Sequence, residues 1–144
     1  MDVLNRIYRF ETEMLGENVE NLFNIHPESI PLWVQDWLPD DAGYFVGNLG
    51  PGRMDFRFFA QGNLLMLATG MATPSQSKAL ANLIEQHWME LIGRMPMKLI
   101  YPAIEGDEWR LITGSDPKNI PWSYHNGGHW PVLIWPLAAA MLKV

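Results

Sequence analysis

The chain has 144 residues, a net charge of −6 and no cysteine, and 48% of its residues are apolar. This length suits one domain, and the composition is that of a folded chain. The absence of cysteine excludes disulfides and thiolate metal sites, and the lack of a basic run argues against a nucleic-acid partner. No apolar run reaches the roughly 20 residues that a membrane-spanning helix needs. The first residues also lack the apolar core of a signal peptide, so we expect a cytoplasmic protein with no membrane partner.

The first half of the chain predicts a helix, a loop region and a buried helix. Residues 2–15 place apolar side chains at helical spacing. Residues 24–53 contain four prolines and four glycines, which favour loops. Within them, IPLWVQDWLP predicts one helical turn and GYFVGNL predicts a short strand. Residues 58–71 are apolar on nearly every side, which predicts a helix in the middle of the fold.

The most regular helix is predicted between Thr73 and Gly93. Thr73 is a good N-cap, Pro74 suits the first helical position, and Gln76 would complete a capping box. Apolar residues then recur at helical spacing. Two extended segments, MKLIYPAI and EWRLIT, are expected after this helix.

The last segment, residues 131–144, predicts another helix that is apolar on almost every side. Pro136 should kink it, because the proline ring would clash with the carbonyl of Val132. Two of the four predicted helices therefore lack a solvent face, and a domain of this size has little interior to hide them. The pattern predicts a piece of a larger helical domain or a chain that oligomerises.

Between these elements, the stretch SDPKNIPWSYHNGGHWP gathers rigid rings and turn residues. His125 and His129 have the i, i+4 spacing of a zinc-binding helix, but the glycines between them disfavour a helix and no glutamate base accompanies them. We therefore expect no metal site. Asn126 and Gly127 form a turn dipeptide, which predicts a tight turn before the last helix.

The segment NLGPGRMDFRFF contains glycines but no phosphate loop, because no Gly-Lys-Ser/Thr follows. Asp55 and Arg57 are two residues apart, so an extended backbone would place them on one face. There they could pair with each other or present a charged fork to a polar ligand. A purely structural salt bridge at a helix start is the alternative.

Two further groups of side chains could serve a ligand. The acids Glu105, Asp107, Glu108 and Asp116 include no specific catalytic pattern, and the first three are most simply an exposed turn. The rings of the stretch, by contrast, lie beside amide, imidazole and carboxylate groups. Aromatic faces suit the C–H face of a sugar, and the polar groups suit its hydroxyls. A hydrophobic hinge between two helices would explain the same rings.

Longer blocks of the sequence resemble a known family. TGSDPKNIPWSYHNGGHWPVL and GYFVGNLGPGRMDFRFFAQGNL are similar to signatures of the alkaline/neutral invertases, glycoside hydrolase family 100. FNIHPESIPLWVQDWLPDDAGY and MKLIYPAIEGDEWRLITGSDPKN match further family blocks in the same order. The resemblance covers essentially all of residues 1–144.

The resemblance implies an all-α fold, here a portion of an (α/α)6 barrel with long loops and short extended segments. It makes residues 1–144 one partial glycosidase domain, incomplete at both ends. It also implies hydrolysis of sucrose to glucose and fructose with inversion and without a metal or other cofactor. The family's acid, an Asp, belongs to a block upstream of those present, and its base, a Glu, to a block after the last helix. No catalytic residue is therefore assigned to this chain.

The pocket wall of the family does match this sequence, and the resemblance implies that it holds sucrose hydroxyls. The matching residues are Asp55, Arg57, Asp116, Lys118, Trp122, Tyr124, His125 and Asn126. The sequence departs from the family at three places. His129 replaces the usual Ser, Gly52-Arg53 replaces Ala-His, and Pro136 lies in a helix that is usually unbroken.

Two functional hypotheses follow. The chain is part of an invertase-type glycosidase that is inactive alone, with the missing barrel segments supplied elsewhere, as on a complementary chain. Alternatively, it is a non-catalytic remnant or sugar-binding module that keeps the pocket wall.

Overall fold

The computed structural model describes residues 30–50 and 53–144; the helix predicted at 2–15 lies outside these residues. The all-α prediction is confirmed in part, because helices are the main regular elements of the described chain. They are α4 (Leu32–Trp37), α5 (Ala60–Ala68), α6 (Pro74–Gln86), α7 (Trp88–Leu91), α8 (Gly106–Thr113) and α9 (Ile134–Met141). Two antiparallel ladders interrupt them: β1 (Asn48–Gly50) pairs with β2 (Arg53–Asp55), and β3 (Phe58–Phe59) pairs with β4 (Ile100–Tyr101). Two short 3-10 turns, η2 (Pro117–Asn119) and η3 (Pro131–Leu133), complete the described elements.

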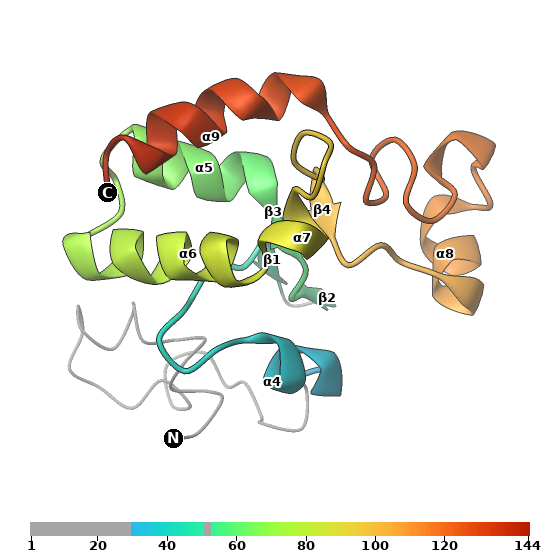
Figure 1. The fold of residues 1–144 in the computed structure, drawn as a ribbon. Helices are drawn as coiled ribbons and strands as arrows, with labels where there is room; N and C mark the ends of the chain where they lie inside the picture. The colour runs from blue at the N-terminus through green and yellow to red at the C-terminus, as the bar shows by residue number, and fades with distance from the viewer. Residues whose placement is uncertain (1–29, 51–52) are drawn as a thin grey trace.

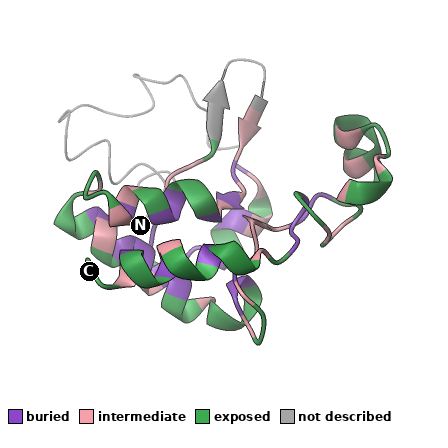
Figure 2. Cartoon of the chain, turned by 90° about the horizontal axis from the view of Figure 1, so that it is seen from above, coloured by how far each residue is buried: buried purple, intermediate pink, exposed green. Residues whose placement is uncertain are grey.

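The helices form one body, and α8 stands apart from it (Figure 1). The red α9 lies along the green α5, and the two helices are in contact. Helix α6 runs beside α5, and α4 lies on the far side of α6. Viewed from above, α8 again projects away from the rest of the molecule (Figure 2). It has no buried residue, so the core is built without it.

The core contains a group of stacked rings, which we call the Trp37 cluster. The Trp37 ring lies 4.6 Å from His87 and 5.3 Å from Tyr101, both stacked, and 5.9 Å from Tyr44 and 6.4 Å from Phe58. These residues come from α4, the loop after it, β3, the end of α6 and β4. The cluster therefore fixes five segments against one another through buried aromatic area.

Asn63 on α5 joins this core to the chain before β1. Its amide accepts a hydrogen bond from the Phe45 N–H (2.8 Å) and donates to the Phe45 carbonyl (3.1 Å) and the Phe59 carbonyl (2.9 Å). The predicted strand GYFVGNL is confirmed only at its end, because β1 begins at Asn48. The Asn63 amide satisfies Phe45 as a partner strand would, which removes the need for a longer ladder.

The helix predicted at 58–71 is confirmed from Ala60, but it begins with a strand and is not buried all round. Phe58 and Phe59 pair with β4, and the Ala60 N–H still donates to the Leu99 carbonyl. One side of α5 is buried, whereas Leu65 on the other side is 47% exposed. The apolar composition of residues 58–71 predicted a helix and gave no sign that Phe58 and Phe59 would pair as a strand.

The capping box predicted for the central helix is confirmed. The Thr73 hydroxyl accepts from the Gln76 N–H, and the Gln76 side chain accepts from the Thr73 N–H. The helix is not continuous to Gly93, because α6 ends at Gln86 and α7 begins at Trp88. His87 lies at the break, where its ring is held by Trp37 and Glu90. The predicted helix is thus interrupted at the residue whose ring makes these tertiary contacts, His87.

The prediction of an extended EWRLIT is wrong, because these residues form most of α8. Asp107 and Glu108 lie in its first turn, where their negative charges interact favourably with the positive end of the helix dipole. Arg110 pairs with Asp107 one turn away, and Gly114 ends the helix with φ 65°. The apolar residues of this segment are therefore spread around a helix that has no buried residue. The other extended prediction, MKLIYPAI, is confirmed at β4.

The last predicted helix is divided into η3 and α9, so Pro136 lies in the first turn of α9. There the missing N–H removes no hydrogen bond within the α-helix, so the proline is accommodated by the 3-10 turn before it rather than by a kink in one long helix. Among the described residues, no helix has the length and apolar character needed to cross a membrane.

Candidate functional site

The first two predicted site residues, Asp55 and Arg57, form a close ion pair. The Arg57 Nε lies 2.9 Å from Asp55 Oδ1 and a terminal guanidinium nitrogen lies 2.5 Å from Oδ2. The Arg57 N–H also donates to Asp55 (3.1 Å). Only about a seventh of each side chain is exposed, 15% for Arg57 and 14% for Asp55. The prediction that the two lie on one face is confirmed, and the bidentate geometry holds both groups rigidly.

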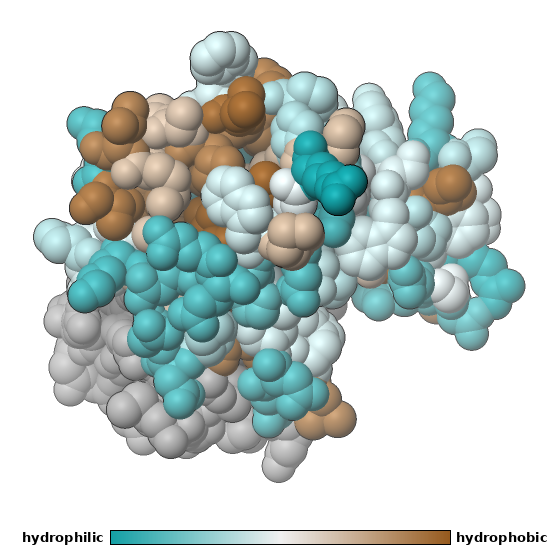
Figure 3. Space-filling model, viewed as in Figure 1, coloured by the Kyte–Doolittle hydropathy of each residue, from teal (hydrophilic) through white to brown (hydrophobic). Residues whose placement is uncertain are grey.

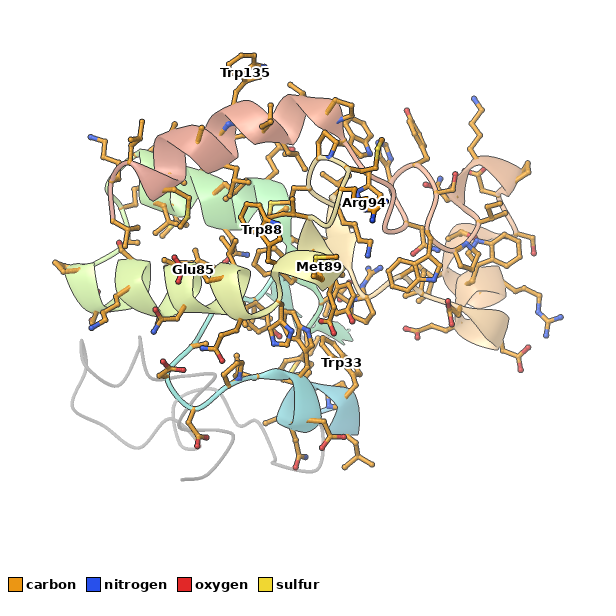
Figure 4. The ribbon with its side chains drawn as sticks, in the orientation of Figure 1. Trp33, Glu85, Trp88, Met89, Arg94 and Trp135 are labelled. Carbon is orange, nitrogen blue, oxygen red and sulfur yellow. The ribbon has the colours of Figure 1, made fainter. Side chains whose placement is uncertain are left out.

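This pair lines a cleft of about 540 Å³. Glu105, which precedes α8, and Glu108, in the first turn of α8, also line this cleft. Trp33, which extends from α4 (Figure 4), also contributes a ring to the lining. The cleft therefore combines an ion pair, carboxylates and an aromatic face, which are the groups that bind a polar organic ligand.

The next predicted residues lie in the loop 115–130, which begins with a capped turn. Asp116 accepts hydrogen bonds from the Lys118 N–H (3.0 Å) and from the Asn119 amide (2.6 Å). These two bonds, in that order, hold the pKa of Asp116 below its ordinary value. Asp116 thus stays ionised and structures η2, while the Lys118 side chain is exposed to solvent.

Asn126 is the buried member of the loop and joins it to the cleft wall. Its amide accepts from the Ile104 N–H (2.7 Å) and donates to the Ile104 carbonyl (2.8 Å) and the Asn119 carbonyl (3.1 Å). Gly127 follows with φ 83°, which fits the predicted tight turn, and a Cβ there would lie 3.0 Å from Ala103. Asn126 therefore places the loop directly behind Glu105, through bonds to backbone rather than through an exposed amide.

Trp122 points back toward that wall. Its indole Nε1–H donates to Glu105 Oε1 at 2.7 Å, and its ring lies 5.9 Å from Tyr101. Lys98 Nζ lies 5.0 Å from the Trp122 ring centre. The side chain is nevertheless 43% exposed, so a half-open ring stands beside the cleft.

Tyr124 and His125 form a second aromatic group with Trp130. The Tyr124 and His125 rings stack at 4.0 Å, and His125 stacks on Trp130 at 5.2 Å. The Trp130 Nε1–H donates to the Tyr124 carbonyl (3.0 Å), which closes the turn around Asn126. Both Tyr124 and His125 are exposed, so this stack offers a ring surface at the rim of the loop.

The structure thus links some predicted residues closely and leaves others apart. Asp55 and Arg57 share the cleft with Glu105, Trp122 reaches that cleft through Glu105, and Asn126 supports it from behind. Tyr124 stacks on His125 and His125 stacks on Trp130, whereas Asp116 and Lys118 lie at the other end of the loop, next to α8.

Sequence reasoning missed Glu105, Trp33 and Lys98 as parts of the site. Glu105 was assigned to an exposed turn, yet it lines the cleft and binds Trp122. Lys98 lay in a predicted extended segment with no distinguishing motif. The pairing of Lys98 with Trp122 spans residues distant in sequence, so no local signal could have revealed it.

A polar group lies on the solvent side of the Trp37 cluster. Glu90 accepts from the Trp37 indole (2.8 Å) and lies 2.9 Å from His87 Nδ1. Burial alone raises the pKa of Glu90, but the Trp37 bond and the charge of His87 outweigh it, so the pKa lies below its ordinary value. Burial, together with Glu90, raises the pKa of Tyr101. Burial lowers the pKa of Lys98, and the charge of Glu90 partly offsets this.

Comparison with known proteins identifies the family of this chain. The sequence profile described as alkaline and neutral invertase matches residues 1–144. The chain belongs to the alkaline and neutral invertase family.

Plant invertases are among its relatives. The chain is 56% identical to alkaline/neutral invertase CINV1 of Arabidopsis thaliana over 140 residues, which are 97% of this chain and 25% of that protein. Cytosolic invertase 1 of Oryza sativa subsp. japonica gives the same identity and coverage. The rice neutral/alkaline invertase 1, mitochondrial, is 52% identical over 144 residues, or 100% of this chain and 23% of that protein. The chain therefore spans about a quarter of the length of these invertases.

Proposed function

We propose that residues 1–144 form part of the substrate-binding wall of an invertase-type glycosidase whose substrate is sucrose. The observation that supports this best is that the Asp55–Arg57 pair lines one cleft with Glu105, which accepts the Trp122 indole N–H, in a member of this family. Arg57 and the carboxylates suit sugar hydroxyls, and the Trp122 ring suits a sugar's C–H face.

The proposed reaction is inverting hydrolysis. One carboxylic acid protonates the glycosidic oxygen, and a carboxylate about 6.5–9.5 Å away activates water on the opposite face. We assign both carboxylates to family segments outside this sequence, and we assign to Asp55, Arg57 and Trp122 the binding and orientation of the sugar. Asn126, with its amide bonded to backbone, supports the wall rather than contacting sucrose.

The fold that fits this role is a portion of an (α/α)6 barrel, with residues 1–144 as one partial domain. An apolar surface over α5 and α9 supports this proposal (Figure 3). Trp135 projects outward from α9 and is 75% exposed (Figure 4), and Ile134 and Leu65 are also exposed. We propose that the other barrel segments of the family cover this surface, on the same polypeptide or on a complementary chain.

The relatives are named for different compartments, with cytosolic, mitochondrial and chloroplastic forms among them. We propose a cytoplasmic location for this chain. Its similarity to the cytosolic rice invertase supports that location, and localisation of a tagged protein in cells tests it.

The binding role can be tested on the purified chain. We expect saturation-transfer NMR to show contact with sucrose and a glucose assay to show no turnover. Trp122→Ala should weaken sucrose binding about tenfold, because stacking of a ring on a ligand contributes about 1 kcal/mol or more. Trp88→Ala is the matched control, because Trp88 is equally exposed (42% against 43%) and lies on α7.

Three results would contradict parts of this proposal. Equal loss of binding in Trp88→Ala would remove Trp122 from the site. Turnover that disappears in Asp116→Ala would place a catalytic group on this chain. Binding that is never accompanied by turnover, even when the remaining family segments are supplied, would favour the non-catalytic sugar-binding module.

A further inference from the structure

Trp122 has a backbone conformation that needs support. Its φ is 64°, in the left-handed region that residues other than glycine rarely adopt. Ser115 and Tyr124 in the same loop also have positive φ, at 60° and 45°. Such strain persists only where surrounding contacts hold it, and it concentrates at ligand-binding segments. The contacts around the Trp122 ring therefore decide whether the ring keeps one orientation.

Four groups from three segments surround this ring. Glu105 Oε1, before α8, accepts the indole N–H at 2.7 Å. Lys98 Nζ, before β4, lies 5.0 Å from the ring centre, and the Tyr101 ring lies at 5.9 Å. Gly127 approaches so closely that an added Cβ would lie 3.1 Å from the Trp122 ring. A half-exposed ring is thus restrained at its edge and on a face.

Lys98 is itself fixed. Its Nζ donates to the Glu90 carbonyl at 2.5 Å and lies 5.6 Å from the Tyr101 ring centre. The ammonium is therefore held by the Glu90 carbonyl close to the Tyr101 and Trp122 rings. Burial lowers the pKa of Lys98, which agrees with a cation drawn partly out of water.

From this geometry we infer that Lys98 and Glu105 are positioning residues, which clamp the Trp122 indole so that the exposed part of the ring meets the sugar. Lys98 occupies one face by a cation–π contact, and Glu105 fixes rotation through the indole N–H. Trp122 is 43% exposed, and this exposed ring surface is available for the C–H surface of a saccharide. This inference rests on the sugar-binding function proposed above.

The clamp also couples two parts of the site. Glu105 lines the cleft beside Asp55 and Arg57, so the group that orients Trp122 belongs to the wall that would contact sugar hydroxyls. A ligand bound in the cleft would therefore meet a ring whose orientation is set by the same wall. We expect the clamp to affect sucrose binding more than it affects folding, because Glu105 and Trp122 are both exposed.

The test compares truncating and conservative variants of the purified chain by NMR. Glu105→Ala and Lys98→Met should each move the Trp122 indole N–H resonance, assigned with Trp122→Phe, and weaken sucrose binding about fivefold, the effect of losing one such contact. Glu105→Gln retains an acceptor and Lys98→Arg retains a cation, so both should restore most of the affinity and the resonance position. A purely structural role would not produce this rescue.

Two controls remove charges that do not belong to the clamp. Asp107→Ala removes a neighbouring carboxylate that pairs with Arg110, and Lys78→Met removes an exposed lysine on α6. Both variants should leave the indole resonance and sucrose affinity unchanged. A thermal melt of every variant separates loss of the clamp from loss of folding.

The outcomes distinguish this inference from the proposed function. An unmoved indole resonance in both Glu105→Ala and Lys98→Met overturns the clamp, even where the wild-type chain binds sucrose. A wild-type chain that does not bind sucrose overturns the proposed function, and the sugar-facing role of the clamp with it. The ligand-free indole resonances then still show whether the two residues hold the ring.

Discussion

The Trp37 cluster and the aromatic loop 115–130 contain the same kinds of ring in opposite surroundings. Trp37 is 8% exposed and stacks on His87 and Tyr101. Trp122 is 43% exposed and is held by one carboxylate and one ammonium. In the cluster, rings from regular elements bury apolar area, whereas in the loop, hydrogen bonds and positive φ values fix rings at the surface. Ring content therefore says little about burial until the backbone is known.

The strongest test of this contrast is truncation of one tryptophan in each region. Trp37→Ala should lower the free energy of unfolding by about 3–5 kcal/mol, because it opens a cavity among packed rings. Trp122→Ala should lower it by about 1 kcal/mol or less, since the ring is half in solvent. Urea denaturation of both variants measures the difference. Equal losses would show that the loop is as much a part of the core as the cluster.

The second test uses two asparagines that are buried among the described residues and have matching bonding patterns. Asn63 bonds both backbone groups of Phe45, and Asn126 bonds both backbone groups of Ile104. Replacing either residue by alanine leaves buried backbone groups unpaired and should cost about 2–3 kcal/mol. Hydrogen exchange should distinguish them: Asn63→Ala should speed exchange across the core, whereas Asn126→Ala should do so mainly at Ile104.

Asn82→Ala is the control for these two variants. Asn82 bonds Asp41 at the surface, so its loss should change the unfolding free energy by less than about 1 kcal/mol. Core-wide exchange in Asn126→Ala would mean that the loop and the core unfold together.

The smallest expected effect is a dependence on acid. The folded pKa of Glu90 lies below its ordinary value of 4.5, so its stabilising contribution is complete above pH 4.5 and is lost as pH falls through the folded pKa. The side chain is 46% exposed, so the contribution should stay below about 1 kcal/mol. Thermal melts between pH 3 and 6 should show a weaker pH dependence for Glu90→Gln than for the wild type.

Asp116 provides the loop's counterpart for this measurement, because its pKa is also lowered. It caps only η2, a short turn with no buried residue, so Asp116→Asn should leave the pH dependence of the global melt unchanged. A larger change in Asp116→Asn than in Glu90→Gln would reverse the assignment of acid sensitivity to the Trp37 cluster.

Local signals predicted the elements that depend on local interactions. The capping box at Thr73, the turn at Asn126 and Gly127, and the pairing of Asp55 with Arg57 were all predicted from neighbouring residues. Each involves groups at most a few positions apart, where helix caps, turn conformations and strand alternation act directly.

Features that depend on distant partners were not predictable in this way. The break at His87 accompanies contacts with Trp37, fifty positions earlier, and β3 forms only because β4 lies beside it. EWRLIT was predicted as extended, yet it forms most of α8, which is exposed and needs no apolar face against the core. The role of Glu105 likewise required the position of Trp122, seventeen residues later.

Helix α8 contributes no buried residue to the core, yet it helps to position the side chains of the candidate site. It has no buried residue, yet Glu105 at its start orients Trp122, and its Trp109 indole donates to the Asn119 carbonyl in the loop. Its outer positions, such as Leu111, which is 85% exposed, can therefore be substituted with little change in the free energy of unfolding. Selection or design could thus adjust ligand preference through this helix while leaving thermal robustness to the core.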